Sequence, residues 1–372
     1  MTSGRILVVD DEPGMLRAVE RVLAADHAVL ALPTPEQALD AGLAFEPDIA
    51  LLDVRLPGMT GLDLMDRLRV SRPDLDVILM TGSQSETDAT HVDAILRKAF
   101  YFIQKPFDRR VLLTLVERCL ELRRLESDNR RHVTRLESEL REARAFQESL
   151  LPPASARIGS VALAARSIPS AELGGDFVAY ADTGGGRVAL LVADVAGHGV
   201  SAAMLTGMVK YAFDSARADG CAPLPTLRRV LDGLHGFEAR RFVTLIAVLL
   251  DPARGVLEWV NAGHPHGLHW SPGRAPERLQ PTGLIASPLF ADRTWSVGRR
   301  PLASGDRLLL FTDGLIELER DGESFGMERI LERIEAREEG GPPLVDDLLA
   351  AADRFAGLPA GDDVTLLAAV LA

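Results

Sequence analysis

Short apolar runs alternate with amphipathic stretches over residues 5–110. The runs are Ile6–Val9, Ala28–Leu32, Ile49–Leu52, Val77–Met80 and Tyr101–Ile103. Each run has the length of a strand, and alternation of strands with helices is typical of a doubly wound parallel sheet. We therefore predict an α/β domain of flavodoxin-like type. Ligands of such sheets bind beyond the carboxyl ends of the strands.

The next segment, residues 111–151, contains neither glycine nor proline and carries both charge signs. Its residues follow a 4-3 spacing, which is typical of a coiled-coil seam. The seam consists of Leu115, Cys119, Leu122, Glu126, Asn129, Val133, Leu136, Leu140, Ala143, Gln147 and Leu150. Its polar members either set the register of a parallel dimer, which we favour, or mark a single solvated helix. Pro152 and Pro153 end the pattern.

Residues 154–372 show a third pattern, in which apolar runs are joined by tight turns. "DTGGGR" (182–187) and "DPARG" (251–255) are hairpin signals. Helical periodicity is expected at Val200–Ala218, Leu224–Ala239 and Leu344–Phe355. These features predict an α+β domain of mainly antiparallel strands.

Composition narrows the class of protein. A chain of 372 residues suits two domains and a linker, and its net charge of −13 argues against general binding to nucleic acid or anionic membranes. The two cysteines, Cys119 and Cys221, fit no metal-ligand spacing and are expected to be free thiols. No signal-like or membrane-spanning apolar stretch is present in the sequence, so we expect a cytoplasmic protein.

Polar residues follow the predicted strands of the first domain. Asp10 and Asp11 follow the first run, Asp53 the third, Thr81 the fourth and Lys105 the fifth. Because the ends of parallel strands share one edge, these side chains should converge. Three carboxylates repel one another unless a cation joins them, and Mg²⁺ suits such oxygen ligands. Asp53 is then placed to accept a phosphoryl group, with Thr81 contacting its oxygens.

The motifs "VVDDEP", "LLDVRLPGMTG", "LMTG" and "FIQKPF" resemble those of the receiver domains of two-component response regulators. The resemblance implies that a cognate histidine kinase phosphorylates Asp53. It implies that Asp11, Asp53 and the backbone carbonyl of Arg55 bind Mg²⁺, with Asp10 acting through water. It also implies a switch pair, Thr81 and Phe102, and a cis bond before Pro106. The run Lys98-Ala99-Phe100-Tyr101 departs from the usual Gly-Ala-aromatic-Asp pattern, which leaves the movement of Phe102 in question.

A second set of acids lies in the C-terminal part, each beside an apolar run. They occur in "LGGDF" (Asp176), "ADVAGHG" (Asp194), "FTDGLIE" (Asp313) and "GDDVT" (Asp362 and Asp363). Carboxylates without cysteine indicate hard ions, Mn²⁺ or Mg²⁺, and two such ions can bind phosphate and activate a water. His198 and His264 are either ligands or acids, or they orient their loops by hydrogen bonding, which we favour.

This second set, with "ARAFQESLLPP", "FVTLIAVLLD" and "NAGHP", resembles the PPM-type serine/threonine phosphatases of the SpoIIE/RsbU branch, across roughly residues 145–372. The resemblance implies a β-sandwich flanked by helices with two Mn²⁺ or Mg²⁺ ions. It implies that Asp194 bridges the ions, that the carbonyl of Val195 binds one, and that Asp313 and Asp362 complete the other. Asp176 would act on metal-bound water, and Asp362 is preferred over Asp363 as the ligand. Val178-Ala179 replace the usual aromatic-Asp pair after "GGDF".

Together these features predict a receiver domain (1–120), a coiled-coil linker (121–151) and a phosphatase domain (152–372). The predicted function is a response regulator whose output is a metal-dependent protein phosphatase. By resemblance, its substrate is a phosphorylated anti-sigma factor antagonist (a STAS-domain protein) in a partner-switching pathway. The predicted coiled-coil seam favours a homodimer as the active form. The alternative is a non-catalytic adaptor that sequesters the antagonist or a sigma factor after phosphorylation.

Overall fold

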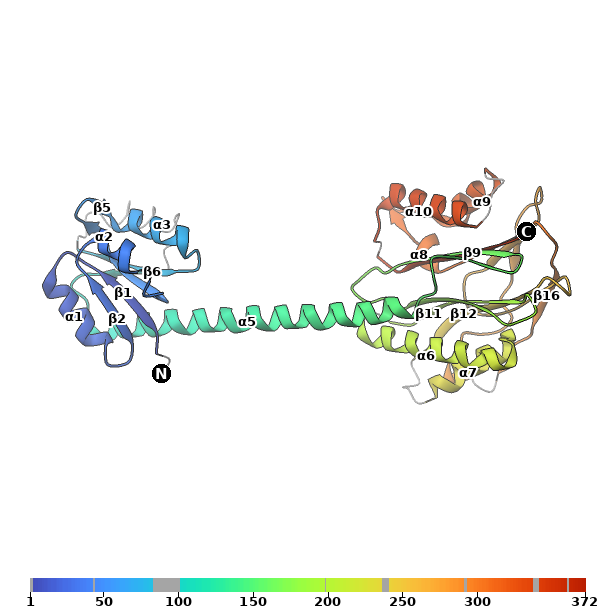
Figure 1. Cartoon of the computed structure of the whole chain (residues 1–372), viewed down its shortest axis with the longest axis horizontal. Helices are drawn as coiled ribbons and strands as arrows, with labels where there is room; N and C mark the ends of the chain where they lie inside the picture. Colours follow the sequence, from blue (N-terminus) through green and yellow to red (C-terminus); the bar gives the residue numbers. More distant parts are fainter. Residues whose placement is uncertain are drawn as a thin grey trace. The chain divides into compact units, whose positions relative to one another are not determined.

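Two structural units are joined within one helix of this chain. A computed structural model describes residues 3–42, 44–82, 101–197, 199–235, 241–290, 293–336, 341–359 and 361–372. The units are Met1–Arg135 and Leu136–Ala372 (Figure 1). The boundary between them falls inside a helix and not in a loop.

The first unit is built on a parallel sheet, as predicted. Its strands are β1 (Arg5–Val9), β2 (Ala28–Leu32), β3 (Ile49–Asp53), β6 (Asp76–Thr81) and β7 (Tyr101–Gln104), in the order β2-β1-β3-β6-β7. All four pairings are parallel. A two-stranded ribbon, β4 (Arg55–Leu56) with β5 (Met59–Thr60), follows β3. The order changes direction between β1 and β3, which places a switch point at the ends of these two strands.

Helices cover both faces of this sheet. The helix α1 (Pro13–Leu23) and the start of α5 (Arg109–Leu150) pack on one face, and α3 (Gly61–Ser71) packs on the other together with α2 (Pro35–Gln37) and the π-helical turn Ala38–Gly42 (Figure 1). A strand buried on both faces requires an almost wholly apolar sequence, which explains why β1 and β3 read as continuous apolar runs.

The helix α5 is continuous over 42 residues, and its two ends are buried in different cores. Cys119 is fully buried in the first unit, whereas Leu150 packs against the core of the second. Between these ends, Val133 and Leu136 are 45% and 58% exposed. The predicted seam is therefore available to a partner only in its middle portion.

The second unit contains two antiparallel sheets. One has the order β10-β11-β12-β13-β16, made of Asp176–Asp182, Val188–Val195, Val243–Asp251, Val256–Ala262 and Gly298–Pro301. The other has the order β15-β14-β17-β20-β9-β8, made of Glu277–Leu279, Gly267–Trp270, Arg307–Phe311, Val364–Leu371, Val161–Ile168 and Ser155–Ile158. A short ribbon pairs β18 (Glu319–Arg320) with β19 (Glu323–Ser324). Both predicted hairpins are present, as β10–β11 and β12–β13.

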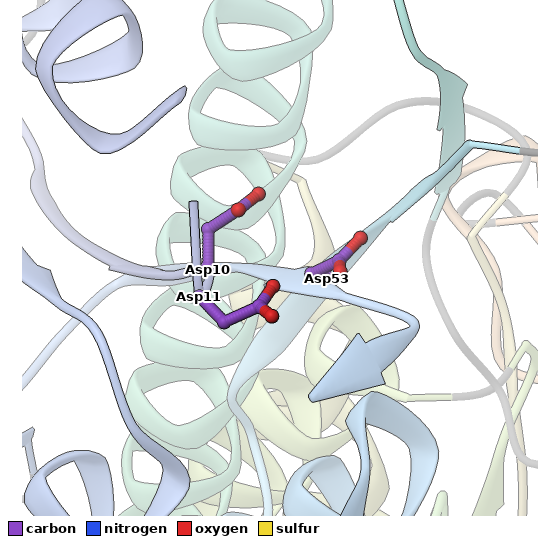
Figure 2. A group of neighbouring side chains, drawn as sticks. All are labelled: Asp10, Asp11 and Asp53. Carbon is purple, nitrogen blue, oxygen red and sulfur yellow. The ribbon is translucent and has the colours of Figure 1, made fainter. Parts of the chain in front are cut away.

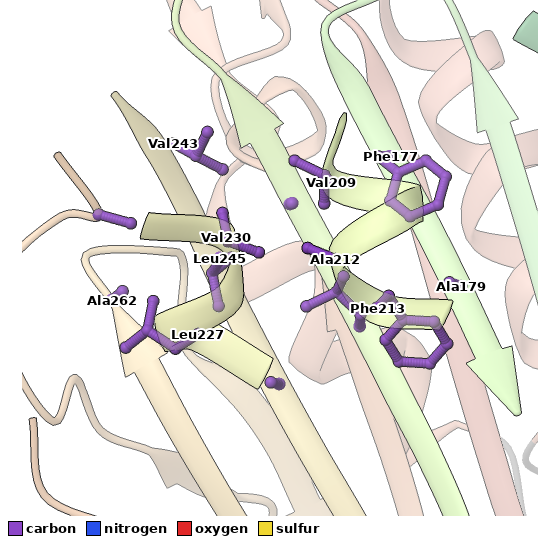
Figure 3. Packing of buried hydrophobic residues seen from close by; sticks show 14 of the residues in the cluster. Phe177, Ala179, Val209, Ala212, Phe213, Leu227, Val230, Val243, Leu245 and Ala262 are labelled. Carbon is purple, nitrogen blue, oxygen red and sulfur yellow. The ribbon is translucent and has the colours of Figure 1, made fainter. Parts of the chain in front are cut away.

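The two sheets form a sandwich with helices on its outer faces. Along β11, Leu190 and Val192 face the core between the sheets, and Leu191 and Ala193 face the helices. The helices α6 (Val200–Ala216) and α7 (Pro223–Leu234) cover the first sheet, as Figure 3 shows for the packing around Phe177 and Phe213. The second sheet is covered by α8 (Asp313–Ile316), α9 (Gly326–Glu335) and α10 (Pro342–Ala356).

The three helices expected in this unit are present with shifted ends. The first ends at Ala216 and continues as the 3₁₀ turn Arg217–Asp219, the second begins at Pro223, and the third covers Pro342–Ala356. A further 3₁₀ turn lies at Pro288–Phe290. Within the described ranges, no helix has both the length and the apolar composition that crossing a membrane requires.

Candidate functional site

The carboxyl edge of the first sheet brings together the polar residues predicted there. The Nζ atom of Lys105 lies 2.6 Å from Oδ2 of Asp10 and 2.8 Å from Oδ1 of Asp53. The other oxygen of Asp10 accepts a hydrogen bond from the backbone N–H of Glu12 at 2.9 Å. Asp10 is fully buried with both oxygens paired, whereas no side-chain contact within the described part of the chain occupies Oδ2 of Asp53.

The same edge fits a divalent cation. Asp10, Asp11 and Asp53 each offer a carboxylate oxygen, and these three atoms lie within 4.8 Å of one another (Figure 2). Burial raises the pKa of Asp53, the Lys105 ammonium opposes this rise, and the charges of Asp10 and Asp11 add to it. One lysine does not neutralise three carboxylates, and an Mg²⁺ ion would offset the repulsion that remains among them. Oxygen donors are the preferred ligands of Mg²⁺.

The remaining receiver residues lie around this edge. Thr81 is buried at the end of β6, and its carbonyl accepts a hydrogen bond from the backbone N–H of Lys105 at 2.7 Å. Phe102 is half-buried on β7, and the bond between Lys105 and Pro106 is cis, as expected. The departure at Lys98-Ala99-Phe100 lies outside the described residues.

In the second unit, the acids of the C-terminal set lie at neighbouring strand ends. Asp176 is the first residue of β10 and pairs in register with Asp194 of β11. Asp313 begins α8 immediately after β17, and Asp362 precedes β20, the strand paired with β17. The sandwich therefore gathers side chains that lie up to 186 residues apart in the sequence.

Burial and mutual repulsion raise the pKa values of three acids at this edge. Burial, followed by the charges of Asp313, Asp362 and Asp363, raises the pKa of Asp194 to about 7. Burial and then the charge of Asp362 raise the pKa of Asp313. Burial raises the pKa of Asp176 well above its usual value, although Thr312 donates a hydrogen bond to its Oδ2 at 2.7 Å.

This donor set fits hard divalent cations. Several carboxylates with raised pKa values face one another, and cations would relieve both their repulsion and their desolvation. Oxygen donors favour Mn²⁺ or Mg²⁺ over zinc. Among the described residues of this unit, no three acids bring their oxygens within 4.8 Å of one another, so the acids surround a wider space than in the first unit.

The two adjacent acids Asp362 and Asp363 have different environments. Asp363 is buried and accepts four hydrogen bonds: from the N–H and hydroxyl of Ser170 at 2.7 and 2.9 Å, from the N–H of Gly175 at 2.6 Å and from the N–H of Asp176 at 3.2 Å. Asp362 is exposed. The Asp363 carboxylate organises the backbone, and Asp362 is the member of the pair open to a ligand.

His264 is a buried residue behind this edge. Its Nδ1 lies 2.8 Å from Oγ1 of Thr244, a residue in register with Asp194. Burial lowers the pKa of His264 to about 3, so its ring is neutral. These contacts support the loop-orienting interpretation. His198 lies outside the described residues.

Sequence reasoning did not assign three contributors to this region: Thr312, Thr244 and Gln147. Thr312 directly precedes Asp313 in "FTDG", so its proximity to an acid was the available signal. Gln147 was interpreted as a polar seam residue; instead, its side chain contacts Gly174 and Thr206 within the second unit. The assignment of Gln147 to the seam was wrong, because a 4-3 spacing does not show which surface a helix end contacts.

The two units define a class of protein: a parallel α/β domain with an acidic edge, followed through a helix by an antiparallel sandwich with a second acidic edge. Residues 6–117 match the response regulator receiver domain, and residues 184–371 match the family of stage II sporulation protein E (SpoIIE). The chain belongs to the SpoIIE family and carries a receiver domain at its N-terminal side.

Individual relatives match part of the chain. Phosphoserine phosphatase RsbP of Bacillus subtilis is 30% identical over 153 residues, which cover 40% of this chain and 38% of RsbP. The DNA-binding transcriptional regulator NtrC of Escherichia coli is 39% identical over 121 residues, which cover 32% of this chain and 25% of NtrC. The chain thus spans well under half the length of either relative.

The fold of the second unit also occurs in a solved structure. The SiaA-PP2C domain of Pseudomonas aeruginosa matches with a TM-score of 0.56 and 24% identity, covering 63% of this chain and 96% of that domain. This likeness supports the sandwich fold and the expected fold class.

Proposed function

We propose that the chain is a response regulator whose second unit hydrolyses phosphoserine or phosphothreonine in another protein, under the control of phosphorylation at Asp53. The observation that carries the proposal is the convergence of Asp194, Asp313 and Asp362 at one edge, where burial and then the charges of the neighbouring acids raise the pKa of Asp194 to about 7. Keeping several carboxylates buried near one another destabilises the folded protein, and such perturbed acids are typical of a functional site, here one that binds cations.

We assign the ligands of the second unit as follows. Asp194, the carbonyl of Val195, Asp313 and Asp362 would hold two Mn²⁺ or Mg²⁺ ions. When bound, these ions supply a water activated for in-line attack on phosphorus. Asp176, oriented by the hydroxyl of Thr312, would hold a proton of that water. In the first unit, Asp11, Asp53 and the carbonyl of Arg55 would hold Mg²⁺, with Asp10 positioned behind them by Lys105.

The partners follow from the same proposal. A histidine kinase would supply the phosphoryl group. The similarity to RsbP, a phosphoserine phosphatase, supports a phosphoserine protein as the substrate. Within that class, we propose a phosphorylated anti-sigma factor antagonist, as the family resemblance implies. The active form would be a homodimer paired through the exposed middle of α5, where Val133 and Leu136 are uncovered.

A metal-dependence assay tests the catalytic proposal. The purified protein is expected to hydrolyse p-nitrophenyl phosphate and a phosphorylated STAS-domain protein with Mn²⁺, and to lose turnover with EDTA. Turnover is measured by phosphate release, with binding of the same phosphoprotein measured in parallel. Binding without turnover at any Mn²⁺ concentration would support the adaptor alternative instead.

Coupling between the units is tested with beryllofluoride, which mimics the phosphorylated aspartate. A coupling of about 1–3 kcal/mol would raise phosphatase turnover roughly 5- to 150-fold. Replacing Leu122, Leu136 and Leu140 by polar residues should remove this activation and shift the dimer to monomer in analytical ultracentrifugation. If beryllofluoride changed the turnover of both proteins equally, the helix pairing would not be the relay.

A further inference from the structure

Gln147, in the last turns of α5, forms a two-point contact with one peptide residue. Its Nε2 donates a hydrogen bond to the carbonyl of Gly174 at 2.7 Å, and its Oε1 accepts one from the N–H of Gly174 at 3.1 Å. Both ends of the carboxamide are thus matched to the donor and acceptor of the same glycine. This reciprocal pairing fixes the side-chain orientation, because exchanging O and N would oppose like groups.

The glycine that Gln147 holds leads directly into the acidic edge. The next residue, Gly175, donates its N–H to Asp363 at 2.6 Å and accepts from the N–H of Val195 at 3.1 Å. Asp176 follows and donates its own N–H to Asp363 at 3.2 Å. A displacement of Gly174 would therefore strain the hydrogen bonds that place Asp176, Asp363 and the Val195 segment.

The Gly174-Gly175 segment has no side chain with which to fix itself. A Cβ atom on Gly174 would lie 2.7 Å from Oδ2 of Asp363, and one on Gly175 would lie 2.9 Å from the carbonyl oxygen of Val195. The close approach of backbone to acid requires glycine at both positions. Two side chains from elsewhere in the unit restrain this segment: Asp363 accepts a hydrogen bond from Gly175, and Gln147 pairs with Gly174.

A third hydrogen bond extends the contact to α6. The Nε2 of Gln147 lies 3.2 Å from Oγ1 of Thr206, whose hydroxyl donates to the carbonyl of Ala203 at 2.7 Å. The helix α6 begins at Val200, shortly after the loop that follows Asp194. One carboxamide thus joins the end of α5 to the chain segments on both sides of the acidic edge.

We propose that Gln147 is a positioning residue for the phosphatase site: its carboxamide holds the Gly174-Gly175 segment so that the acidic edge is in the metal-binding arrangement only while the end of α5 is seated. This inference rests on the proposed function and adds the atoms through which the helix acts. It also gives Gln147 a role distinct from that of the exposed seam residues.

The test compares two variants of similar size with a neighbouring control. Gln147→Met removes all three hydrogen bonds, and Gln147→Glu keeps the acceptor but sets a carboxylate oxygen against the Gly174 carbonyl. Glu148→Gln is the control, since Glu148 lies on the same turn, is exposed, and its side chain pairs with Arg144 on the helix surface.

Two measurements separate positioning from general stability. Hydrogen exchange of peptide 170–177 in the metal-free protein should accelerate in both Gln147 variants and remain unchanged in Glu148→Gln. The Mn²⁺ concentration for half-maximal turnover should rise about 10- to 100-fold, as is usual when groups behind metal ligands are removed, with little change in KM for p-nitrophenyl phosphate.

Unchanged exchange and unchanged Mn²⁺ dependence in folded Gln147 variants would overturn the inference. Loss of the folded state in both variants would overturn it as well, because Gln147 would then be structural. An inactive wild-type protein would instead contradict the proposed function, and the exchange measurement would still report on the contact with Gly174.

Discussion

Asp194→Asn is expected to lower Mn²⁺-dependent turnover by orders of magnitude while stabilising the metal-free protein at about pH 8. In the folded protein the pKa of Asp194 is raised from 3.8 to about 7. The carboxylate of the unfolded chain ionises at lower pH than that of the folded protein. The free energy of unfolding therefore falls as the pH rises from 3.8 to about 7, and the full destabilisation is present above pH 7. An asparagine does not ionise, and the variant should gain about 1–3 kcal/mol, measured by thermal unfolding in EDTA.

The matched control for this experiment is Asp363→Asn. Because Asp363 accepts hydrogen bonds on both oxygens, an amide nitrogen there would face N–H donors, and this variant should lose stability. It should retain more turnover at saturating Mn²⁺ than Asp194→Asn does. Near wild-type turnover in Asp194→Asn, or the opposite order of the two variants, would contradict the ligand assignment.

Asp53→Ala is expected to abolish phosphorylation of the first unit. Incubation with acetyl phosphate and Mg²⁺ should add one phosphoryl group to the wild type, labile in base as an acyl phosphate is. Asp10 cannot substitute as the nucleophile, since Lys105 and the Glu12 N–H occupy its oxygens. Intact-protein mass spectrometry measures the result.

Asp11→Asn provides the comparison for this experiment. Asp11 is exposed at the same edge, and its loss should slow phosphorylation by weakening Mg²⁺ binding without removing the acceptor. A phosphoryl group that persisted in Asp53→Ala would place the acceptor elsewhere and would remove the basis for control through β3.

The fold was largely predictable because burial requires patterns that are visible in a single sequence. The five strands of the first sheet appear as apolar runs, since the central strands are buried on both faces and the edge strands β2 and β7 are partly buried. The hairpins of the second unit are marked by glycine-rich turns. Helix ends were less predictable: α6 ends at Ala216, where no proline or glycine marks the change.

The acidic edges were predictable in outline, since an aspartate after an apolar run must lie at a strand end. The division of roles between Asp362 and Asp363 could not be derived from spacing alone. It depends on Ser170 and Gly175, which lie nearly 190 residues away in the sequence and reach Asp363 only through the pairing of β9 with β20 and of β10 with β11. The role of Gln147 was hidden for the same reason: its partner is a backbone group, which no residue type marks.

The position of Gln147 has a practical consequence for where a fragment that carries the proposed phosphatase site should begin. A fragment cut at Pro152, where the helical pattern ends, would keep Asp176, Asp194, Asp313 and Asp362 but lose the carboxamide that pairs with Gly174. A fragment limited to residues 184–371 would also lack the β10 strand that carries Asp176. The second unit begins at Leu136, inside the helix, so the last turns of α5 belong to the proposed phosphatase unit and not only to the linker.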